Sequence, residues 1–199
     1  MAHIDYFFAT VSPFTYLTDG RFEEIAARHG VSVTYKPLDI FALFGRTGGV
    51  PVKDRHPARQ DYRLQELRRA AKKTGLPFNL KPAFFPTNPA PSGYAVIAAQ
   101  NADGGDLGKL VAAFGRCCWA DEKNIADDDV IRACLEEAGF DPALADKGFL
   151  EGAETFAANL EEAVNRGVFG APFYITDTDE RFWGQDRLAD LDLHLAGKL

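Results

Sequence analysis

The segment of residues 4–17 constrains the fold of this chain more than any other, because it places a buried strand directly before a helix. Residues 4–11 (IDYFFATV) are rich in aromatic and branched side chains, which is typical of a strand buried on both faces. From Phe14 to Ile25 the apolar residues recur at helical spacing. Ser12-Pro13 stands between the two patterns, as an N-cap followed by a residue favoured at the first helical position.

This pattern places the Ser12 hydroxyl at the positive end of the predicted helix, where unpaired N–H groups and the helix dipole stabilise an anion. The stretch alone leaves two interpretations of Ser12 open: a simple helix cap, or a group that binds an anion. Arg28-His29-Gly30 gives the helix a basic last turn and a glycine stop. Residues 31–38 (VSVTYKPL) alternate and predict a second strand. Strand, helix and strand form a βαβ unit, so the two strands should be parallel.

Beyond residue 38 the pattern becomes helical, and it returns to strands only near the C-terminus. Residues 76–92 contain five prolines, which indicates an irregular connection. Strands are expected at 173–175 and 181–183, joined by a five-residue turn, before a last helix capped by Asp186. We therefore predict an α/β fold, a thioredoxin-like βαβ…ββα arrangement interrupted by an inserted all-helical subdomain. Residues 1–38 and 168–199 would form the discontinuous thioredoxin-like domain, and residues 39–167 the inserted helical domain.

The inserted region contains a helical pattern over residues 59–73, ended by Gly75. It should turn four side chains to the core and a basic face to solvent. The predicted core residues are Tyr62, Leu64, Leu67 and Ala71, and the basic residues are Arg63, Arg68, Arg69, Lys72 and Lys73. The further helical patterns span 41–44, 92–102, 106–120, 127–138, 142–148 and 153–167.

Composition narrows the classes of function. The net charge is −7, from 22 basic and 29 acidic residues, which argues against a nucleic-acid partner. No run of 18 apolar residues and no export signal are present, so we expect no membrane partner and a cytoplasmic location. The three cysteines include no C-x-x-C pair, which indicates reduced, buried thiols. The four histidines show no metal-ligand spacing, so no metal site is predicted.

The corner Ser12-Pro13-Phe14-Thr15 occupies the place where thioredoxin-fold oxidoreductases carry Cys-x-x-Cys. A serine there, followed by Pro-aromatic-Thr-aromatic-Leu, resembles the family of 2-hydroxychromene-2-carboxylate isomerases and kappa-class glutathione transferases. In that family the thiolate belongs to bound glutathione, and the serine hydroxyl donates a hydrogen bond to it. The resemblance implies that Ser12 is catalytic and that Ser12 and Phe14 contact glutathione.

A second match lies at residues 167–173 (GVFGAPF), which resemble the Gly-x-x-Gly-x-Pro segment that places a cis-proline opposite the active-site corner. An X-Pro bond is cis in only about 5–6% of folded cases, so physics alone does not require it here. The resemblance implies a cis Ala171–Pro172 bond beside Ser12. Its backbone would then pair with glutathione as an added strand.

The third match is Trp183-Gly184-Gln185-Asp186-Arg187, which in isolation is typical of a turn followed by an N-cap aspartate. In the family, an aromatic-Gly-polar-Asp-Arg segment binds the γ-glutamyl end of glutathione. The resemblance implies that Asp186 pairs with the α-ammonium group. The N–H groups of Gln185 and Asp186 would meet the α-carboxylate.

The middle of the chain departs from the family pattern. Family members carry Thr/Ser-Gly-Asn-x-x-Pro where this chain has Thr47-Gly48-Gly49-Val50-Pro51, so Gly49 lacks the side chain of a ligand-contacting asparagine. Residues 85–88 match the family's Phe-Pro-x-Asn, which borders the pocket for the second substrate. The resemblance implies that Gly49 and Asn88 border that pocket.

Taken together, the three separated matches imply a homodimeric, glutathione-dependent cis–trans isomerase. Its substrate would be an aromatic α,β-unsaturated keto acid like 2-hydroxychromene-2-carboxylate, isomerised by thiolate addition, bond rotation and elimination. Two alternatives stay open: a kappa-like glutathione transferase, and a thioredoxin-like binding module without redox activity. Net consumption of glutathione would indicate the first, and binding without turnover the second.

Overall fold

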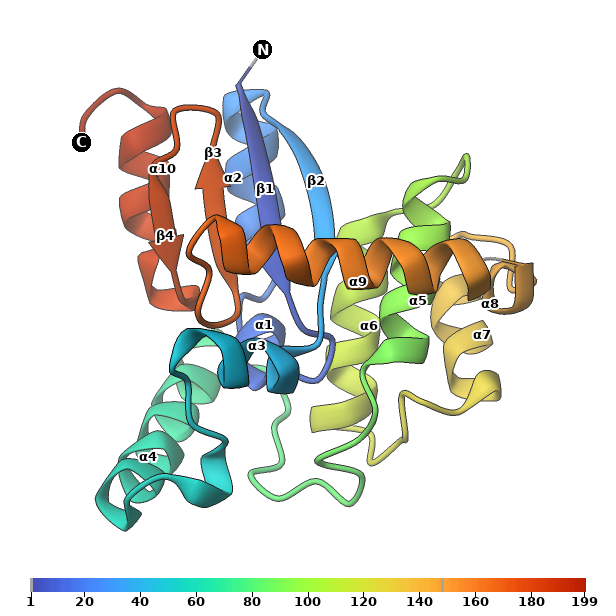
Figure 1. Cartoon of the computed structure of the whole chain (residues 1–199), viewed down its shortest axis with the longest axis horizontal. Helices are drawn as coiled ribbons and strands as arrows, with labels where there is room; N and C mark the ends of the chain where they lie inside the picture. Colours follow the sequence, from blue (N-terminus) through green and yellow to red (C-terminus); the bar gives the residue numbers. More distant parts are fainter. Residues whose placement is uncertain (1, 148) are drawn as a thin grey trace.

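A four-stranded mixed sheet lies at the centre of the computed structural model, which describes residues 2–147 and 149–199. The strands are β1 (His3–Phe8), β2 (Ser32–Pro37), β3 (Phe173–Thr176) and β4 (Arg181–Trp183), in the order β2-β1-β3-β4 (Figure 1). β1 and β2 are parallel, whereas β1–β3 and β3–β4 are antiparallel. The predicted βαβ unit, the C-terminal hairpin and the α/β class are therefore confirmed.

The side chains of β1 alternate between the two faces of the sheet. On one face Tyr6 packs against Phe22 of α2 (Arg21–His29) and stacks on Tyr174 of β3, with ring centroids 4.6 and 5.1 Å away. α10 (Leu188–Leu195) lies on α2, and a 2.6 Å contact between His29 Nε2 and Asp192 Oδ1 joins the two helices. Burial of these aromatic rings is what holds α2 to the sheet.

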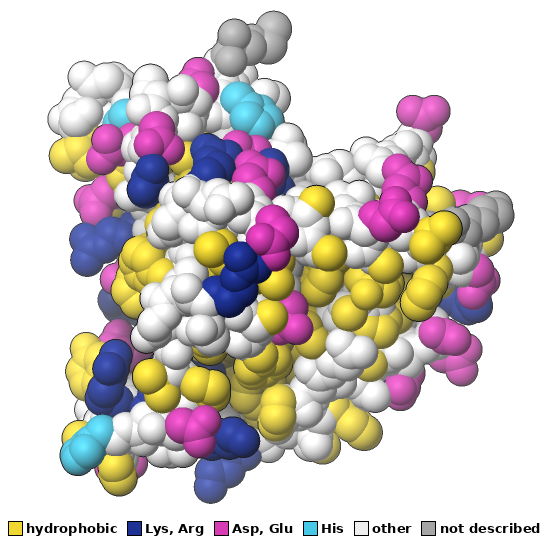
Figure 2. All heavy atoms as spheres, in the orientation of Figure 1, with side chains coloured by type: hydrophobic (Ala, Val, Ile, Leu, Met, Phe, Trp, Pro, Cys, Tyr) yellow, Lys and Arg dark blue, Asp and Glu magenta, His cyan; other side chains and the backbone are white. Residues whose placement is uncertain are grey.

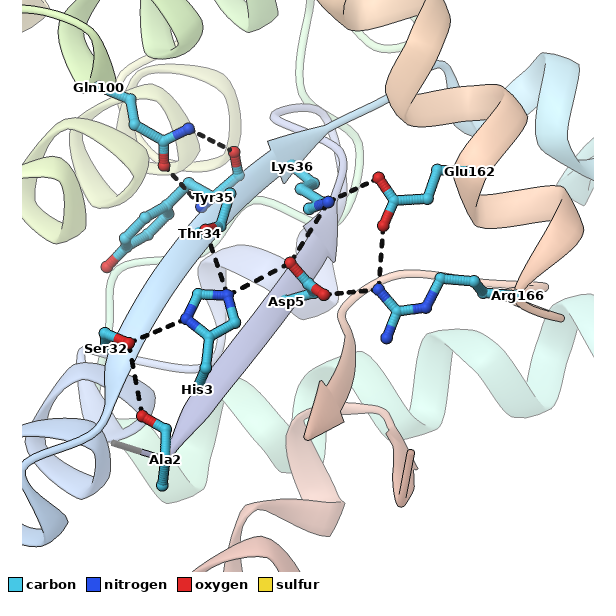
Figure 3. Close-up of polar contacts among 10 residues, drawn as sticks. All are labelled: Ala2, His3, Asp5, Ser32, Thr34, Tyr35, Lys36, Gln100, Glu162 and Arg166. Atoms are coloured by element: carbon cyan, nitrogen blue, oxygen red, sulfur yellow. Dashed lines mark hydrogen bonds and ion pairs between the residues drawn. The ribbon is translucent and has the colours of Figure 1, made fainter. Parts of the chain in front are cut away.

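The other face of the sheet is crossed by α9 (Phe149–Asn165), as Figure 1 shows. Lys36 Nζ lies 3.3 Å from Asp5 Oδ1 and 2.5 Å from Glu162 Oε2, and Arg166 joins the same two acids (Figure 3). We call these four residues the sheet ion cluster. Burial acts to raise the pKa of Asp5, but the hydrogen bond from Arg166 and the attraction of Lys36 outweigh it, so this pKa lies below its usual value.

The other helices lie between β2 and β3 in sequence and cover most of the predicted helical patterns. They are α3 (Ile40–Thr47), η1 (Val52–Asp54), α4 (Pro57–Thr74), α5 (Ala90–Gln100), α6 (Leu107–Trp119), α7 (Asp128–Glu137) and α8 (Leu144–Lys147). Residues 75–89 form the irregular connection that their prolines predict. This connection contains a cis bond at Phe85–Pro86, which was not predicted.

The prediction of one continuous helix after Ser12 is wrong. α1 (Pro13–Tyr16) is a single turn, and α2 begins only at Arg21. Asp19 and Gly20 separate the two helices in the left-handed region, with φ of 56° and 69°. Gly20 adopts this conformation without strain, and Asp tolerates it better than most residues. The dipole behind Ser12 is therefore that of one turn rather than of a long helix.

Three expectations about individual side chains are also wrong. Tyr62 is 58% exposed and does not join the core, whereas Leu67 does. Arg63 is half-buried instead of solvated. Asp186 makes no capping hydrogen bond, because it lies within η2 (Gln185–Arg187), and the cap position of α10 is Arg187.

The cysteine thiols are all buried, as expected, and free. The sequence did not anticipate that Cys117 Sγ on α6 lies 3.6 Å from Cys134 Sγ on α7. Within the described residues no helix has the length and apolarity needed to cross a membrane. No group of three or more potential metal ligands forms among those residues either.

Candidate functional site

A cavity of about 960 Å³ opens beside the turn that follows β1. This volume lies near the upper end of the range of about 300–1,000 Å³ for small-molecule sites. Three parts of the chain line it: residues 11–14, residues 40–63 of α3, η1 and α4, and residues 169–171 with Trp183, while Phe85 and Pro86 close one side. Hydrophobic side chains are visible in the recess beside α3 and α4 in Figure 2.

Ser12 lies at the end of the cavity nearest the sheet and is only 8% exposed. Its hydroxyl accepts a hydrogen bond from the N–H of Thr15 at 3.3 Å, so it does cap α1. The same hydroxyl donates to the carbonyl oxygen of Ala171 at 3.4 Å. At that length the second bond is weak, so the Ser12 proton can turn to a ligand at little cost. Capping and lining the cavity are therefore compatible roles for one side chain.

The Ala171–Pro172 peptide bond is cis, as the resemblance implies. Ala171 lines the cavity, whereas Pro172 is buried behind it and does not. The carbonyl of Pro172 accepts a hydrogen bond from the N–H of Gly184 at 2.9 Å. This bond ties the segment that begins at Trp183 to the cis-proline, and Ser12 completes a continuous rim.

The Trp183 ring forms part of this rim and is 52% exposed. It packs on Gly170, where an added Cβ would come within 2.4 Å of Trp183 Nε1. Phe169 contacts the ring edge-on, with 4.8 Å between centroids. A side chain at position 170 would therefore push Trp183 away from the cavity.

Gly184, Gln185 and Asp186 follow Trp183 outside the cavity lining. Asp186 is largely exposed, and its carboxylate lies 3.8 Å from the guanidinium of Arg187. It also folds back over Gly184, where an added Cβ would lie 2.5 Å from Asp186 Oδ1. These three residues thus lie just beyond the rim, and the hydrogen bond from Gly184 to Pro172 connects them to the residue that follows Ala171.

The two residues expected to border the second-substrate pocket differ in position. Gly49 lines the cavity, and an added Cβ there would come within 2.4 Å of the Phe44 ring. An asparagine at position 49 would therefore displace Phe44. Asn88 does not line the cavity. It is exposed, and its Oδ1 accepts a hydrogen bond from the N–H of Ala90 at the start of α5.

The part of the cavity wall formed by η1 and α4 carries basic residues that the sequence did not predict there. Lys53, Arg55, Arg59 and Arg63 line the cavity. A signal was present in the sequence: residues 59, 63 and 67 lie four apart on one helix face, and Leu67 was expected in the core. The same spacing that buries Leu67 turns Arg63 inward.

Comparisons with known proteins confirm the thioredoxin-like fold. The model of the DsbA-like thioredoxin domain matches residues 3–196. The chain is 32% identical to a 2-hydroxychromene-2-carboxylate isomerase of Sphingobium xenophagum, over 96% of this chain and 97% of that protein. It is 26% identical to the isomerase of the same name from Pseudomonas putida, over 95% and 92%. A solved structure of a 2-hydroxychromene-2-carboxylate isomerase superposes with a TM-score of 0.75 at 23% identity, covering 98% of this chain and 95% of that one.

The chain therefore belongs to the family of DsbA-like thioredoxin domains. Within this class it is a member of the 2-hydroxychromene-2-carboxylate isomerase family, because the similarity to the Sphingobium protein covers nearly the whole of both chains. The names of its relatives support an isomerase function.

Proposed function

We propose that this protein is a glutathione-dependent cis–trans isomerase of an aromatic α,β-unsaturated keto acid of the 2-hydroxychromene-2-carboxylate type. The observation that carries the proposal is the contact between the Ser12 hydroxyl and the carbonyl of the cis Ala171–Pro172 segment at the cavity wall. It joins a hydroxyl donor and an extended backbone edge, the two features that a thiol-bearing tripeptide requires.

The residues present fit glutathione. The Ala171 backbone borders the cavity and can pair with an extended peptide. Asp186 offers an exposed carboxylate to an ammonium group at the outer end of the rim. When bound, glutathione would supply a thiolate that adds to the double bond, permits rotation and is then expelled.

Ser12 would act on the protonation state of the thiol. A free thiol has a pKa near 8.5, so most of it is protonated at neutral pH. A hydroxyl donor favours the anion, and each unit of pKa corresponds to about 1.4 kcal/mol. The N–H of Phe14 has no acceptor within the described part of the chain, so it can add a second donor. Since α1 is one turn long, these two local donors would outweigh the helix dipole.

The apolar wall would hold the aromatic part of the substrate. Phe41, Phe44 and Phe85 line the cavity. Their rings can pack on a planar aromatic group and exclude water from the reacting carbons.

The test is an activity and binding series on Ser12→Ala. We expect turnover to fall by about 100-fold, as for loss of an oxyanion donor, while glutathione still raises the melting temperature. Ser32→Ala, at an exposed serine on β2, is the control. Loss of the cap should cost about 1 kcal/mol, so unfolding is measured in parallel. Full activity in Ser12→Ala would contradict a catalytic role and would mean that Ser12 only caps α1. Steady loss of free glutathione during turnover would indicate a transferase instead.

A second experiment tests the orientation of glutathione. Asp186→Asn should weaken its binding by about 1.5–3 kcal/mol, the range for hydrogen bonds to charged groups. A glutathione analogue without the γ-glutamyl ammonium should bind both proteins equally. Asp177→Asn, in the exposed β3–β4 turn, is the control. A difference between wild type and Asp186→Asn that persists with the analogue would contradict the pairing.

A further inference from the structure

The charge of the cavity wall is opposite to that of the whole chain. The protein carries 29 acidic and 22 basic residues, yet the cavity lining includes four basic residues and no acidic one among those that the structure describes. All four lie between residues 53 and 63, in η1, the following turn and the first half of α4. Figure 2 shows basic side chains around this part of the face.

Arg63 is half-buried in the cavity wall. Burial, and then the charge of Arg55, lower the pKa of Arg63 to about 10. The side chain is therefore still charged at neutral pH. No acid and no hydrogen-bond acceptor is assigned to it within residues 2–147 and 149–199. A half-buried cation without a counter-charge is costly, and a bound anion would relieve that cost.

Arg55 is positioned beside Arg63 by contacts at one edge of its guanidinium. Its Nε donates to the carbonyl of Val50 at 2.7 Å, and its Cζ lies 5.7 Å from the centroid of the Phe44 ring. Gln60 fixes the turn by donating to the carbonyl of Arg55 at 2.8 Å. Burial and the charge of Arg59 lower the pKa of Arg55. With Nε engaged, the two terminal NH2 groups of Arg55 remain for a ligand.

We propose that Arg63, assisted by Arg55, binds the carboxylate of the aromatic acid that occupies this cavity. A carboxylate on a planar apolar body matches a wall that combines guanidinium groups with the Phe41 and Phe44 rings. The identity of this acid as the substrate rests on the proposed function. The carboxylate site itself rests on the charge and burial of the wall.

The test uses trans-cinnamate, an aromatic carboxylate, and its neutral analogue trans-cinnamyl alcohol, both without glutathione. Binding to the full-length protein is followed by calorimetry. Arg63→Gln should weaken cinnamate binding by about tenfold or more and leave the alcohol within twofold. Arg68→Gln, on the exposed side of the same helix, should change neither. Arg63→Lys should restore only part of the affinity, because an ammonium cannot form the bidentate contact.

The glutathione arm separates the two possible sources of a carboxylate. If Arg63 serves the aromatic acid, Arg63→Gln leaves glutathione affinity within twofold of the wild type. A tenfold loss for glutathione with unchanged cinnamate binding would assign Arg63 to the tripeptide and overturn the proposal. Undetectable cinnamate binding in the wild type, or equal losses for cinnamate and the alcohol, would overturn it too.

A measurement on the wild type alone covers the case in which a variant fails to fold. Cinnamate affinity should fall with added NaCl while the alcohol's affinity does not, because only the former depends on charge pairing. Failure of the proposed function looks different: glutathione would neither bind nor support turnover, while the cinnamate series would keep its dependence on Arg63.

Discussion

The sheet ion cluster and the cavity wall both contain partly buried cations, but only those of the cluster are paired with carboxylates. In the cluster, Lys36 and Arg166 each contact two carboxylates, those of Asp5 and Glu162 (Figure 3). At the cavity wall, Arg63 is half-buried with no carboxylate in reach among the described residues. Burial alone therefore does not tell what a cation does. The presence or absence of an ion-pair partner is more informative. The paired cations hold α9 on the sheet, whereas the unpaired Arg63 is the residue that we propose binds a carboxylate ligand.

Replacing an acid of the cluster should have the largest effect on stability. Asp5→Asn removes the charge that Lys36 and Arg166 share, in a side chain that is only 17% exposed. We expect the free energy of unfolding at pH 7 to fall by about 2 kcal/mol, within the range for hydrogen bonds to charged groups. Urea unfolding measures it. Glu136→Gln, at an exposed site on α7, should stay within about 0.5 kcal/mol of the wild type. A similar result for both variants would mean that the cluster contributes nothing.

The pH dependence of the same variant gives the next largest effect. Because the pKa of Asp5 is lowered in the folded state, its contribution is present above the unfolded pKa, near 3.9, and is lost as pH falls through the folded pKa. The deficit of Asp5→Asn should therefore be constant from pH 7 to about pH 5 and shrink below about pH 4. Urea titrations of both proteins between pH 7 and pH 2.5 test this. A deficit that persists at pH 2.5 would have to come from packing.

Removing a charge from the cavity wall should raise the free energy of unfolding instead of lowering it. Arg63→Met removes an unpaired charge and keeps an apolar side chain of similar length. The unliganded protein should gain about 1 kcal/mol, because burial of the guanidinium no longer costs free energy. The gain should be present at pH 7 and decrease above about pH 10, where the folded wild type loses this charge. Arg68→Met is the control, and a destabilised Arg63→Met would mean that Arg63 supports the fold.

The sequence was sufficient for the parts of this structure that depend on local pattern. Alternation of side chains gave β2 and the β3–β4 hairpin, and Ser12-Pro13 marked the start of α1. The cis bond at Ala171–Pro172 followed from resemblance, not from physics. The predictions that were wrong concern features set by backbone conformation or by contacts with residues distant in the sequence. The helix broke at Asp19-Gly20 because the chain enters the left-handed region there, and apolar spacing continues across the break.

The candidate site was predictable only in part, for a similar reason. Ser12, Ala171 and Trp183 lie on elements whose order fixes where they meet. Asn88 and Arg63 lie on or beside helices whose orientation depends on contacts with distant segments. A basic helix face in an acidic protein is ordinarily solvated, so the sequence predicts that Arg63 is exposed like Arg68 and Arg69. Only the position of α4 beside α3 shows that one of these residues faces a cavity.

Two adjacent residues of α9 offer the finest test of the comparison. Glu161 and Glu162 share residue type and helix, and both face a cation. Glu162 is 35% exposed and pairs with Lys36 and Arg166, whereas Glu161 is 59% exposed and, within residues 2–147 and 149–199, pairs with Arg46 alone. Glu162→Gln should lower the free energy of unfolding by about 0.5–1 kcal/mol, because Lys36 and Arg166 both lose the negative charge of a half-buried ion-pair partner. Glu161→Gln should leave the urea midpoint unchanged within error, because solvent screens an exposed pair. Both midpoints are measured at low and at 0.5 M NaCl, and only that of Glu162→Gln should keep its distance from the wild type. Equal shifts for the two variants would show that the number of partners and their burial do not set the strength of these pairs.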